Sequence, residues 1–239
     1  MNDELYTRIF EDLGGEFVTS AFELHKKLNI TRAFLFDWDG VFNTGTKGHG
    51  QTSLYSEVDS MGINMLRFAY WLKNKQMPLI AIITGENNLS AFQLAQREHF
   101  DAVYFHVNHK IEALSHLKQR HIIENEQVLF CFDDILDVSL AEVVGARFLV
   151  KRKSNPLFLN YAKKHQICDY ITGSESGQHA VREICELVLG IEDVYDDTIS
   201  KRIAYSNEYQ TYLKERNQIE TLFFTKKDNE ITQVNISGS

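Results

Sequence analysis

Two aspartates one residue apart, Asp37 and Asp39, follow a short apolar run and precede a glycine. In an extended chain, residues i and i+2 project to the same side, so both carboxylates can face one small volume. Adjacent carboxylates repel each other, and Mg²⁺ relieves the repulsion because it takes oxygen ligands and also neutralises a phosphate. The pair alone fits equally well a strand that ends in a solvated acidic turn, so the rest of the chain must decide.

More polar residues follow other apolar runs or open helical patterns. In chain order they are Thr84 with Gly85, Lys110, and Asp133 with Asp134 and Asp137. A parallel sheet brings the carboxyl ends of its strands to one crevice, so we expect these side chains to gather beside Asp37.

Such a set suits phosphoryl transfer to an aspartate. Asp37 would attack phosphorus and form an aspartyl-phosphate, which divides a difficult hydrolysis into two easier steps. Asp39 would protonate the leaving oxygen and then deprotonate the water. The Thr84 hydroxyl and the Gly85 amide would bind phosphoryl oxygens, and Lys110 would offset their charge.

The same set contains ligands for a hard cation. Asp133, Asp37 and a main-chain carbonyl near Asp39 would hold Mg²⁺, which would orient the phosphate. Asp134 and Asp137 would contact these ligands without binding the metal directly, and Asp137 would orient Lys110 or the metal. A histidine metal site is disfavoured because oxygen ligands suit Mg²⁺ better than Zn²⁺.

Each residue by itself also has a structural interpretation. Thr84 and Gly85 fit an ordinary turn, and Lys110 fits a solvated lysine at a helix start. Asp133 and Asp134 could cap the helix that follows, because aspartate is favoured at that position. The order and spacing of the whole set favour the catalytic interpretation.

The elements that must position these residues alternate along the chain. Strands are predicted at residues 33 to 37, 79 to 83, 102 to 105, 127 to 132 and 147 to 150 and near 170 to 171. Helices are predicted at residues 63 to 75, 89 to 98, 110 to 120, 138 to 144, 156 to 165 and 178 to 189. This alternation predicts an α/β fold with a doubly wound, mostly parallel, Rossmann-like sheet.

Three segments are expected. Residues 1 to 32 suggest two short amphipathic helices, residues 33 to 190 the catalytic domain, and residues 191 to 239 an extension for packing or oligomerisation. Within the domain, residues 43 to 62 are rich in glycine and alternate in polarity, which predicts a β-hairpin flap.

Composition limits the partners. The chain has 239 residues, a net charge of -8 and 44% hydrophobic residues. This acidic balance argues against nucleic acid and anionic membranes as partners. The polar start and the lack of a long apolar run predict a cytoplasmic protein, and the three cysteines, Cys131, Cys168 and Cys185, are expected to be buried thiols.

The ordered motifs resemble those of the haloacid dehalogenase superfamily of phosphohydrolases over residues 33 to 190. They are Phe36-Asp37-Trp38-Asp39-Gly40-Val41, Ile83-Thr84-Gly85, Lys110 and Asp133-Asp134-Ile135-Leu136-Asp137. The spacing leaves no room for a cap domain. The resemblance therefore implies an open crevice that serves a large substrate or is closed by a neighbouring subunit.

Residues 58 to 63 and 180 to 183 resemble the family of 3-deoxy-octulosonate 8-phosphate and related nonulosonate 9-phosphate phosphatases. That resemblance implies a homotetramer, in which flap and tail complete the neighbour's site, and substrate-binding roles for Asp59 and Arg182. Gly85 is expected to bind the substrate through its amide, and His179, near the predicted mouth, either helps to recognise substrate or is a polar surface residue. Val58 and Gln178 stand where that family has arginines, and Phe132 stands where it has a small residue. Neither Val nor Gln replaces a bidentate arginine, so the substrate can differ.

The sequence thus predicts a Mg²⁺-dependent phosphatase of a small phosphorylated metabolite, a sugar or sugar acid. The alternative is a catalytically weak or inactive protein of the same fold that works by binding or assembly. A mutase is disfavoured because no cap is present to exclude water.

Overall fold

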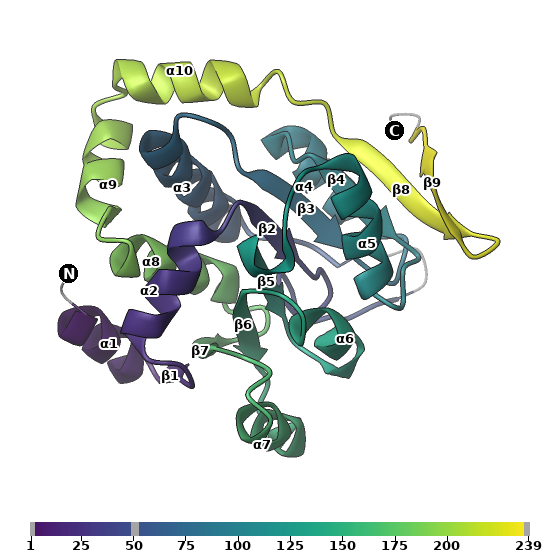
Figure 1. The fold of residues 1–239 in the computed structure, drawn as a ribbon, viewed down its shortest axis with the longest axis horizontal. Helices are drawn as coiled ribbons and strands as arrows, with labels where there is room; N and C mark the ends of the chain where they lie inside the picture. Colours follow the sequence, from purple (N-terminus) through teal and green to yellow (C-terminus); the bar gives the residue numbers. More distant parts are fainter. Residues whose placement is uncertain (1–2, 49–52, 237–239) are drawn as a thin grey trace.

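The computed structural model describes residues 3–48 and 53–236. In these residues, helices cover both faces of one nine-stranded sheet (Figure 1). The strands are β1 (Glu16–Phe17), β2 (Ala33–Phe36), β3 (Leu79–Ile83), β4 (Ala102–Phe105), β5 (Val128–Phe132), β6 (Ala146–Lys151), β7 (Tyr170–Glu175), β8 (Leu222–Lys227) and β9 (Glu230–Val234). Their spatial order is β1-β7-β6-β5-β2-β3-β4-β8-β9, and all neighbours are parallel except at the two edges, β1 and β9.

Two hydrophobic cores lie on opposite faces of this sheet. Along β2, Phe34 and Phe36 enter one core, whereas Ala33 and Leu35 enter the other. The central strands are apolar at every position because both of their faces are buried. The predicted α/β, doubly wound, mostly parallel fold is therefore confirmed.

Most helices pack on the first core. They are α1 (Asp3–Asp12), α2 (Ala21–Ile30), α3 (Glu57–Asn74), α4 (Leu89–Glu98), α8 (Ala180–Ile191), α9 (Tyr195–Ile203) and α10 (Asn207–Arg216). The second core is covered by α5 (Ile111–Arg120), α6 (Val138–Ala141) and α7 (Pro156–Lys164). None of these described helices combines the length and the hydropathy needed to span a bilayer.

The predicted β-hairpin flap at residues 43 to 62 is wrong in its described part. Residues 43–48 and 53–56 form no strand longer than a single bridge residue, and α3 already begins at Glu57. The Ser56 hydroxyl accepts a hydrogen bond from the Val58 amide (3.1 Å) and so caps this helix. Residues 49–52, which would hold the hairpin turn, lie outside the described residues.

The C-terminal segment contributes to the sheet. β8 pairs in parallel with β4, so the yellow hairpin of β8 and β9 extends the sheet edge in Figure 1. Strands from all three predicted segments thus join one sheet, and the division at residues 33 and 190 stays a prediction. The three cysteines are buried and unpaired, as expected, and burial raises the pKa of the Cys131 thiol.

Candidate active site

A cavity of about 230 Å³ lies at the carboxyl ends of the central strands. Its lining residues come from the segments after β2, β3, β4, β5 and β6. They are Asp37, Asp39, Lys47, Thr84, Gly85, Glu86, Val107, Asn108, Lys110, Asp133, Asp134, Leu136, Asp137 and Arg152. The structure therefore brings eight of the predicted site residues to one place.

Lys110 connects two of the acids. It lies at the start of α5, is 3% exposed, and forms ion pairs with the carboxylates of Asp37 and Asp137. Burial by itself lowers the pKa of a lysine, but Asp137 and Asp37 outweigh it and raise the Lys110 pKa. Lys110 therefore stays charged between two buried carboxylates.

Three buried carboxylates form a cluster. Asp37, Asp133 and Asp137 each contribute one oxygen, and these oxygens lie within 4.8 Å of one another. Burial raises the pKa of Asp37 to about 6, with repulsion from Asp137 adding to the shift and Lys110 opposing it. Burial and then repulsion from Asp37 and Asp137 raise the pKa of Asp133 to about 9. Both shifts indicate a shortage of positive charge.

The donor set of this cluster fits a hard divalent cation. The buried oxygens Asp133 Oδ2 and Asp137 Oδ1 make no hydrogen bond, although each has an ion-pair partner, Arg152 and Lys110 respectively. Unsaturated carboxylate oxygens are the ligands that Mg²⁺ prefers. Asp137 Oδ2 accepts from the amides of Asp133 (3.3 Å) and Asp134 (3.2 Å), which holds the segment after β5 in place.

The Asp39 carboxylate does not join this cluster, contrary to the expected side-by-side pair. It receives hydrogen bonds from Ser53 Oγ (2.7 Å) and Asn88 Nδ2 (2.9 Å) and an ion pair from Lys47 (2.8 Å). Burial on its own raises the Asp39 pKa, but these three donors outweigh burial and lower it. The third carboxylate of the cluster is that of Asp137, which was expected to support the ligands or to orient Lys110.

Thr84 and Gly85, which follow β3, also line the cavity. The Thr84 hydroxyl is buried and accepts from Asn88 Nδ2 (2.9 Å), which also reaches Asp39. A Cβ atom at Gly85 would lie 2.8 Å from Oδ1 of the exposed Asn108 side chain, which can turn aside. Asn88 was not predicted, although its place soon after the Thr-Gly pair was a usable signal.

Two cations of the cavity were also not predicted, Lys47 and Arg152. Arg152 follows β6, and its Nε lies 2.6 Å from Asp133 Oδ2. The available signal was its position just after a predicted strand, at the same sheet edge as the acids.

Three residues that were expected to bind substrate do not line the cavity: Asp59, His179 and Arg182. Asp59 is buried in the first turn of α3 and accepts from the Arg182 amide (2.9 Å) at the start of α8. His179 Nδ1 lies 3.7 Å from Asp59, and Arg182 Nε donates to Glu186 (2.7 Å). Within this chain Asp59 therefore joins the first turn of α3 to the start of α8.

Phe132 does not enter the cavity. It is fully buried and stacks on Phe130, with ring centroids 5.6 Å apart. Its bulk therefore belongs to the second core. Asp134, which follows, lines the cavity and accepts a hydrogen bond from the Ile135 amide (2.7 Å) at the start of a short 3-10 helix, Ile135–Asp137.

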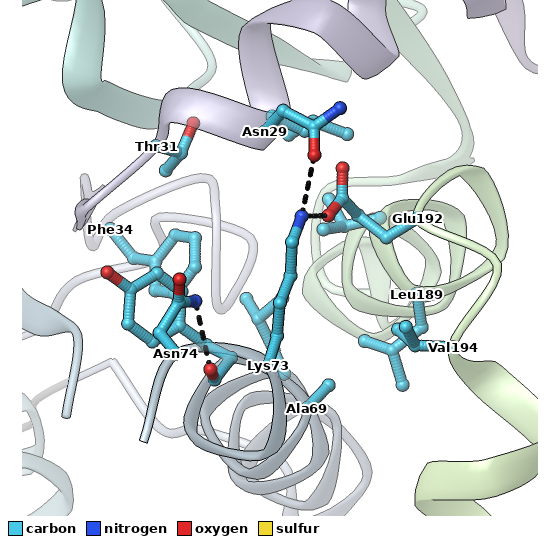
Figure 2. A pocket seen from close by; sticks show the side chains of 13 residues that line it. Asn29, Thr31, Phe34, Ala69, Lys73, Asn74, Leu189, Glu192 and Val194 are labelled. Atoms are coloured by element: carbon cyan, nitrogen blue, oxygen red, sulfur yellow. Dashed lines mark hydrogen bonds and ion pairs between the residues drawn. The ribbon is translucent and has the colours of Figure 1, made fainter. Parts of the chain in front are cut away.

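Another pocket lies near the amino end of β2, away from the acids. Figure 2 shows Lys73 of α3 reaching Asn29 (2.7 Å) and Glu192 across it. Its volume of about 30 Å³ has room for little more than a water molecule. The cavity at the carboxyl ends of the strands remains the candidate active site.

Comparison with known proteins agrees with this geometry. No protein-family model matches the chain. The chain is 29% identical over 186 residues to 3-deoxy-D-manno-octulosonate 8-phosphate phosphatase KdsC of Escherichia coli, a match that covers 77% of this chain and 92% of that protein. A structure from Legionella pneumophila, described as a hydrolase of the haloacid dehalogenase superfamily, superposes with a TM-score of 0.63 at 25% identity over 77% of this chain and 95% of that one.

A third similar protein is the Moraxella catarrhalis 3-deoxy-D-manno-octulosonate 8-phosphate phosphatase. Its structure shares the fold, with a TM-score of 0.62 at 24% identity over 75% of this chain and 97% of that one. In sequence and in fold, this chain is therefore similar to phosphohydrolases of the haloacid dehalogenase superfamily. The E. coli and Moraxella catarrhalis proteins are both named as 3-deoxy-D-manno-octulosonate 8-phosphate phosphatases.

Proposed function

We propose that this chain is a Mg²⁺-dependent phosphatase that hydrolyses a sugar-acid phosphate or a similar phosphorylated metabolite. The observation that carries the proposal is the convergence of Asp37, Asp133, Asp137 and Lys110 in one cavity. Carboxylate oxygens for a cation and a buried ammonium beside an aspartate are what phosphoryl transfer to that aspartate needs.

In the proposed reaction, Asp37 attacks phosphorus and displaces the ester oxygen, which takes a proton from Asp39. Asp39 then accepts a proton from water as the water attacks the aspartyl-phosphate, which releases phosphate and restores Asp37. The Thr84 hydroxyl and the Gly85 amide bind phosphoryl oxygens during both steps.

Asp37 and Asp133 would hold the cation, together with the main-chain carbonyl of Asp39 and with Asp137 beside it. When bound, Mg²⁺ supplies positive charge that screens the carboxylates and orients the phosphate. Lys110 holds Asp37 in place and keeps one positive charge beside it throughout the reaction.

Similar proteins support a sugar acid as the substrate. The E. coli relative is named for 3-deoxy-D-manno-octulosonate 8-phosphate, and the Moraxella catarrhalis structure is a complex with a magnesium ion, a phosphate ion and a KDO molecule. Val58 and Gln178, in place of the expected arginines, leave the particular sugar acid open.

The second candidate is a weakly catalytic protein that works by binding. One observation favours it: Lys47 and Arg152 already pair with Asp39 and Asp133, so two of the acids have cationic partners without a metal.

A substrate panel separates the two candidates. Phosphate release from phosphorylated sugars and sugar acids is measured with Mg²⁺, with a chelator, and for Asp37→Asn beside the exposed control Asp197→Asn. We expect Mg²⁺-dependent turnover in the wild type and in the control only. Equal slow rates under all conditions would favour the second candidate.

Assembly and location stay predictions. The open cavity favours a homo-oligomer, which we expect to be a tetramer in the cytoplasm. Light scattering of the active protein tests the assembly, and a fully active monomer would contradict it.

A further inference from the structure

Arg152 places a guanidinium group inside the acidic cavity. Its side chain is 25% exposed, and its Nε lies 2.6 Å from Asp133 Oδ2. Neither of these two buried atoms makes a hydrogen bond. The contact is therefore a charge contact without the directional bonding that would fix it.

The backbone around Gly40 leaves room for this guanidinium. A Cβ atom at Gly40 would lie 2.0 Å from Arg152 Nη2 and 2.1 Å from Asp133 Oδ2. A Cβ atom at Gly45 would lie 3.3 Å from the same Nη2 atom. Arg152 therefore fills the space between Asp133 and the backbone that follows Asp39.

This space adjoins the position that a cation would occupy if the Asp133 carboxylate were one of its ligands. Asp37 and Asp137 supply the other oxygens of the cluster within 4.8 Å. Two positive charges at one carboxylate oxygen repel each other strongly in a partly buried site. A divalent cation and the Arg152 guanidinium would therefore oppose each other at Asp133 Oδ2.

We propose that Arg152 competes with the divalent cation for Asp133, so that metal binding requires the guanidinium to leave this carboxylate. The inference rests on the proposed function only in placing a cation at the acidic cluster, and it needs no turnover. The apparent affinity for the metal is then reduced by the fraction of molecules in which Arg152 holds Asp133.

Calorimetric titration of the metal-free protein with Mg²⁺ tests the competition. Arg152→Gln keeps much of the side-chain volume and removes the charge. Its matched control is Lys153→Gln, which removes one positive charge from the neighbouring residue, whose side chain is 79% exposed. We expect the Mg²⁺ dissociation constant to fall roughly tenfold in Arg152→Gln, the value of one charge-assisted contact. In Lys153→Gln it should change less than about twofold, because solvent and salt screen an exposed charge.

Thermal unfolding of each variant is measured first, to show that the variant is folded. If Arg152→Gln does not fold, Arg152→Lys replaces it in the titration. We expect Arg152→Lys to lie between the wild type and the neutral variant, because the ammonium makes a weaker contact than the guanidinium. An unchanged or weaker affinity in Arg152→Gln would overturn the competition. Tighter Mg²⁺ binding in Arg152→Gln would support the competition. If the wild type at the same time turned over no substrate of the panel, the phosphatase proposal would be overturned while the competition stood.

Discussion

Asp37 and Asp39 lie two residues apart, yet their carboxylates have different partners. Asp37 pairs with Lys110 in the buried cluster, whereas Asp39 pairs with Lys47 and Ser53. Burial raises the pKa of Asp37 to about 6, and hydrogen bonds that outweigh burial lower the pKa of Asp39. Two carboxylates in such different surroundings are suited to different tasks. The ionised Asp39 is ready to accept a proton from water, and it must leave Lys47 before it can act as an acid.

Mg²⁺ should stabilise the protein through the acidic cluster. A ligand at a hundred times its dissociation constant adds about 2.7 kcal/mol to the free energy of unfolding. We expect a matching rise in melting temperature for the wild type and no rise for Asp133→Asn, because the variant lacks a charged ligand. Asp197→Asn, a change at an exposed residue of α9, should respond like the wild type. A full Mg²⁺ response in Asp133→Asn would exclude Asp133 as a ligand.

Lys110→Met should be strongly destabilising. The change leaves Asp37 and Asp137 buried without their cationic partner. Loss of one partner from a buried ion pair costs about 3 to 5 kcal/mol, which urea unfolding measures. The control is Lys26→Met, which breaks a half-exposed pair with Glu23 and should cost less than about 1 kcal/mol. Equal effects of the two changes would contradict the buried network.

Asp169 should make the free energy of unfolding depend on pH in the acidic range. Its buried carboxylate accepts from Thr19 Oγ1 (2.7 Å), Lys27 Nζ (2.6 Å) and Arg147 Nη2 (2.9 Å). Burial alone would raise the Asp169 pKa, but Arg147, Lys27 and Thr19 outweigh burial and lower it. A carboxylate with a lowered folded-state pKa stabilises the protein above its unfolded pKa, and this stability is lost as pH falls through the folded pKa.

Asp169→Asn should therefore lower the free energy of unfolding by about 3 kcal/mol at neutral pH. The difference from the wild type should shrink as the pH falls below about 4, where the unfolded carboxylate is protonated. Asp12→Asn breaks an exposed pair with Arg8 and should have little effect at any pH. A difference for Asp169→Asn that stayed constant down to strong acid would show that charge is not its cause.

β8 should be an integral part of the sheet. Phe224 is 1% exposed and stacks on Tyr104 of β4, with ring centroids 5.0 Å apart. Phe224→Ala should cost about 3 to 5 kcal/mol in urea unfolding. Ile203→Ala removes an exposed side chain of α9 and should stay within about 0.5 kcal/mol of the wild type. A small effect of Phe224→Ala would indicate that β8 packs only loosely.

The sequence predicted the parallel core well, because buried strands are short apolar runs between helical patterns. The strands at residues 79 to 83 and 102 to 105 agree with β3 and β4 at both ends. The start of α3 was missed because residues 53 to 58 alternate in polarity as a strand does. In the structure, Ser56 caps a helix that begins at Glu57. β8 was missed because its stability comes from pairing with β4, which is distant in sequence.

The site was predicted where chemistry and strand ends coincide, as at Asp37, Lys110 and Asp133. Side-chain direction was not predictable: the same-side rule placed Asp39 beside Asp37, but β2 ends at Phe36, so the rule for extended chain does not hold there. Asp39 pairs with Lys47 instead. Arg152 was overlooked because Lys-Arg-Lys has the composition of a solvated basic turn. Only the position of Asp133 in space gives this arginine its partner.

The central claim is that Asp37 is the nucleophile of the acidic cluster. The most direct measurement is mass spectrometry of the protein after rapid mixing with a phosphorylated sugar acid and Mg²⁺ and quenching in acid. We predict a phosphoryl group on the peptide that contains Asp37 in the wild type, and none in Asp37→Asn. Turnover without any phosphoryl group on Asp37, or a fully active Asp37→Asn variant, would contradict the account.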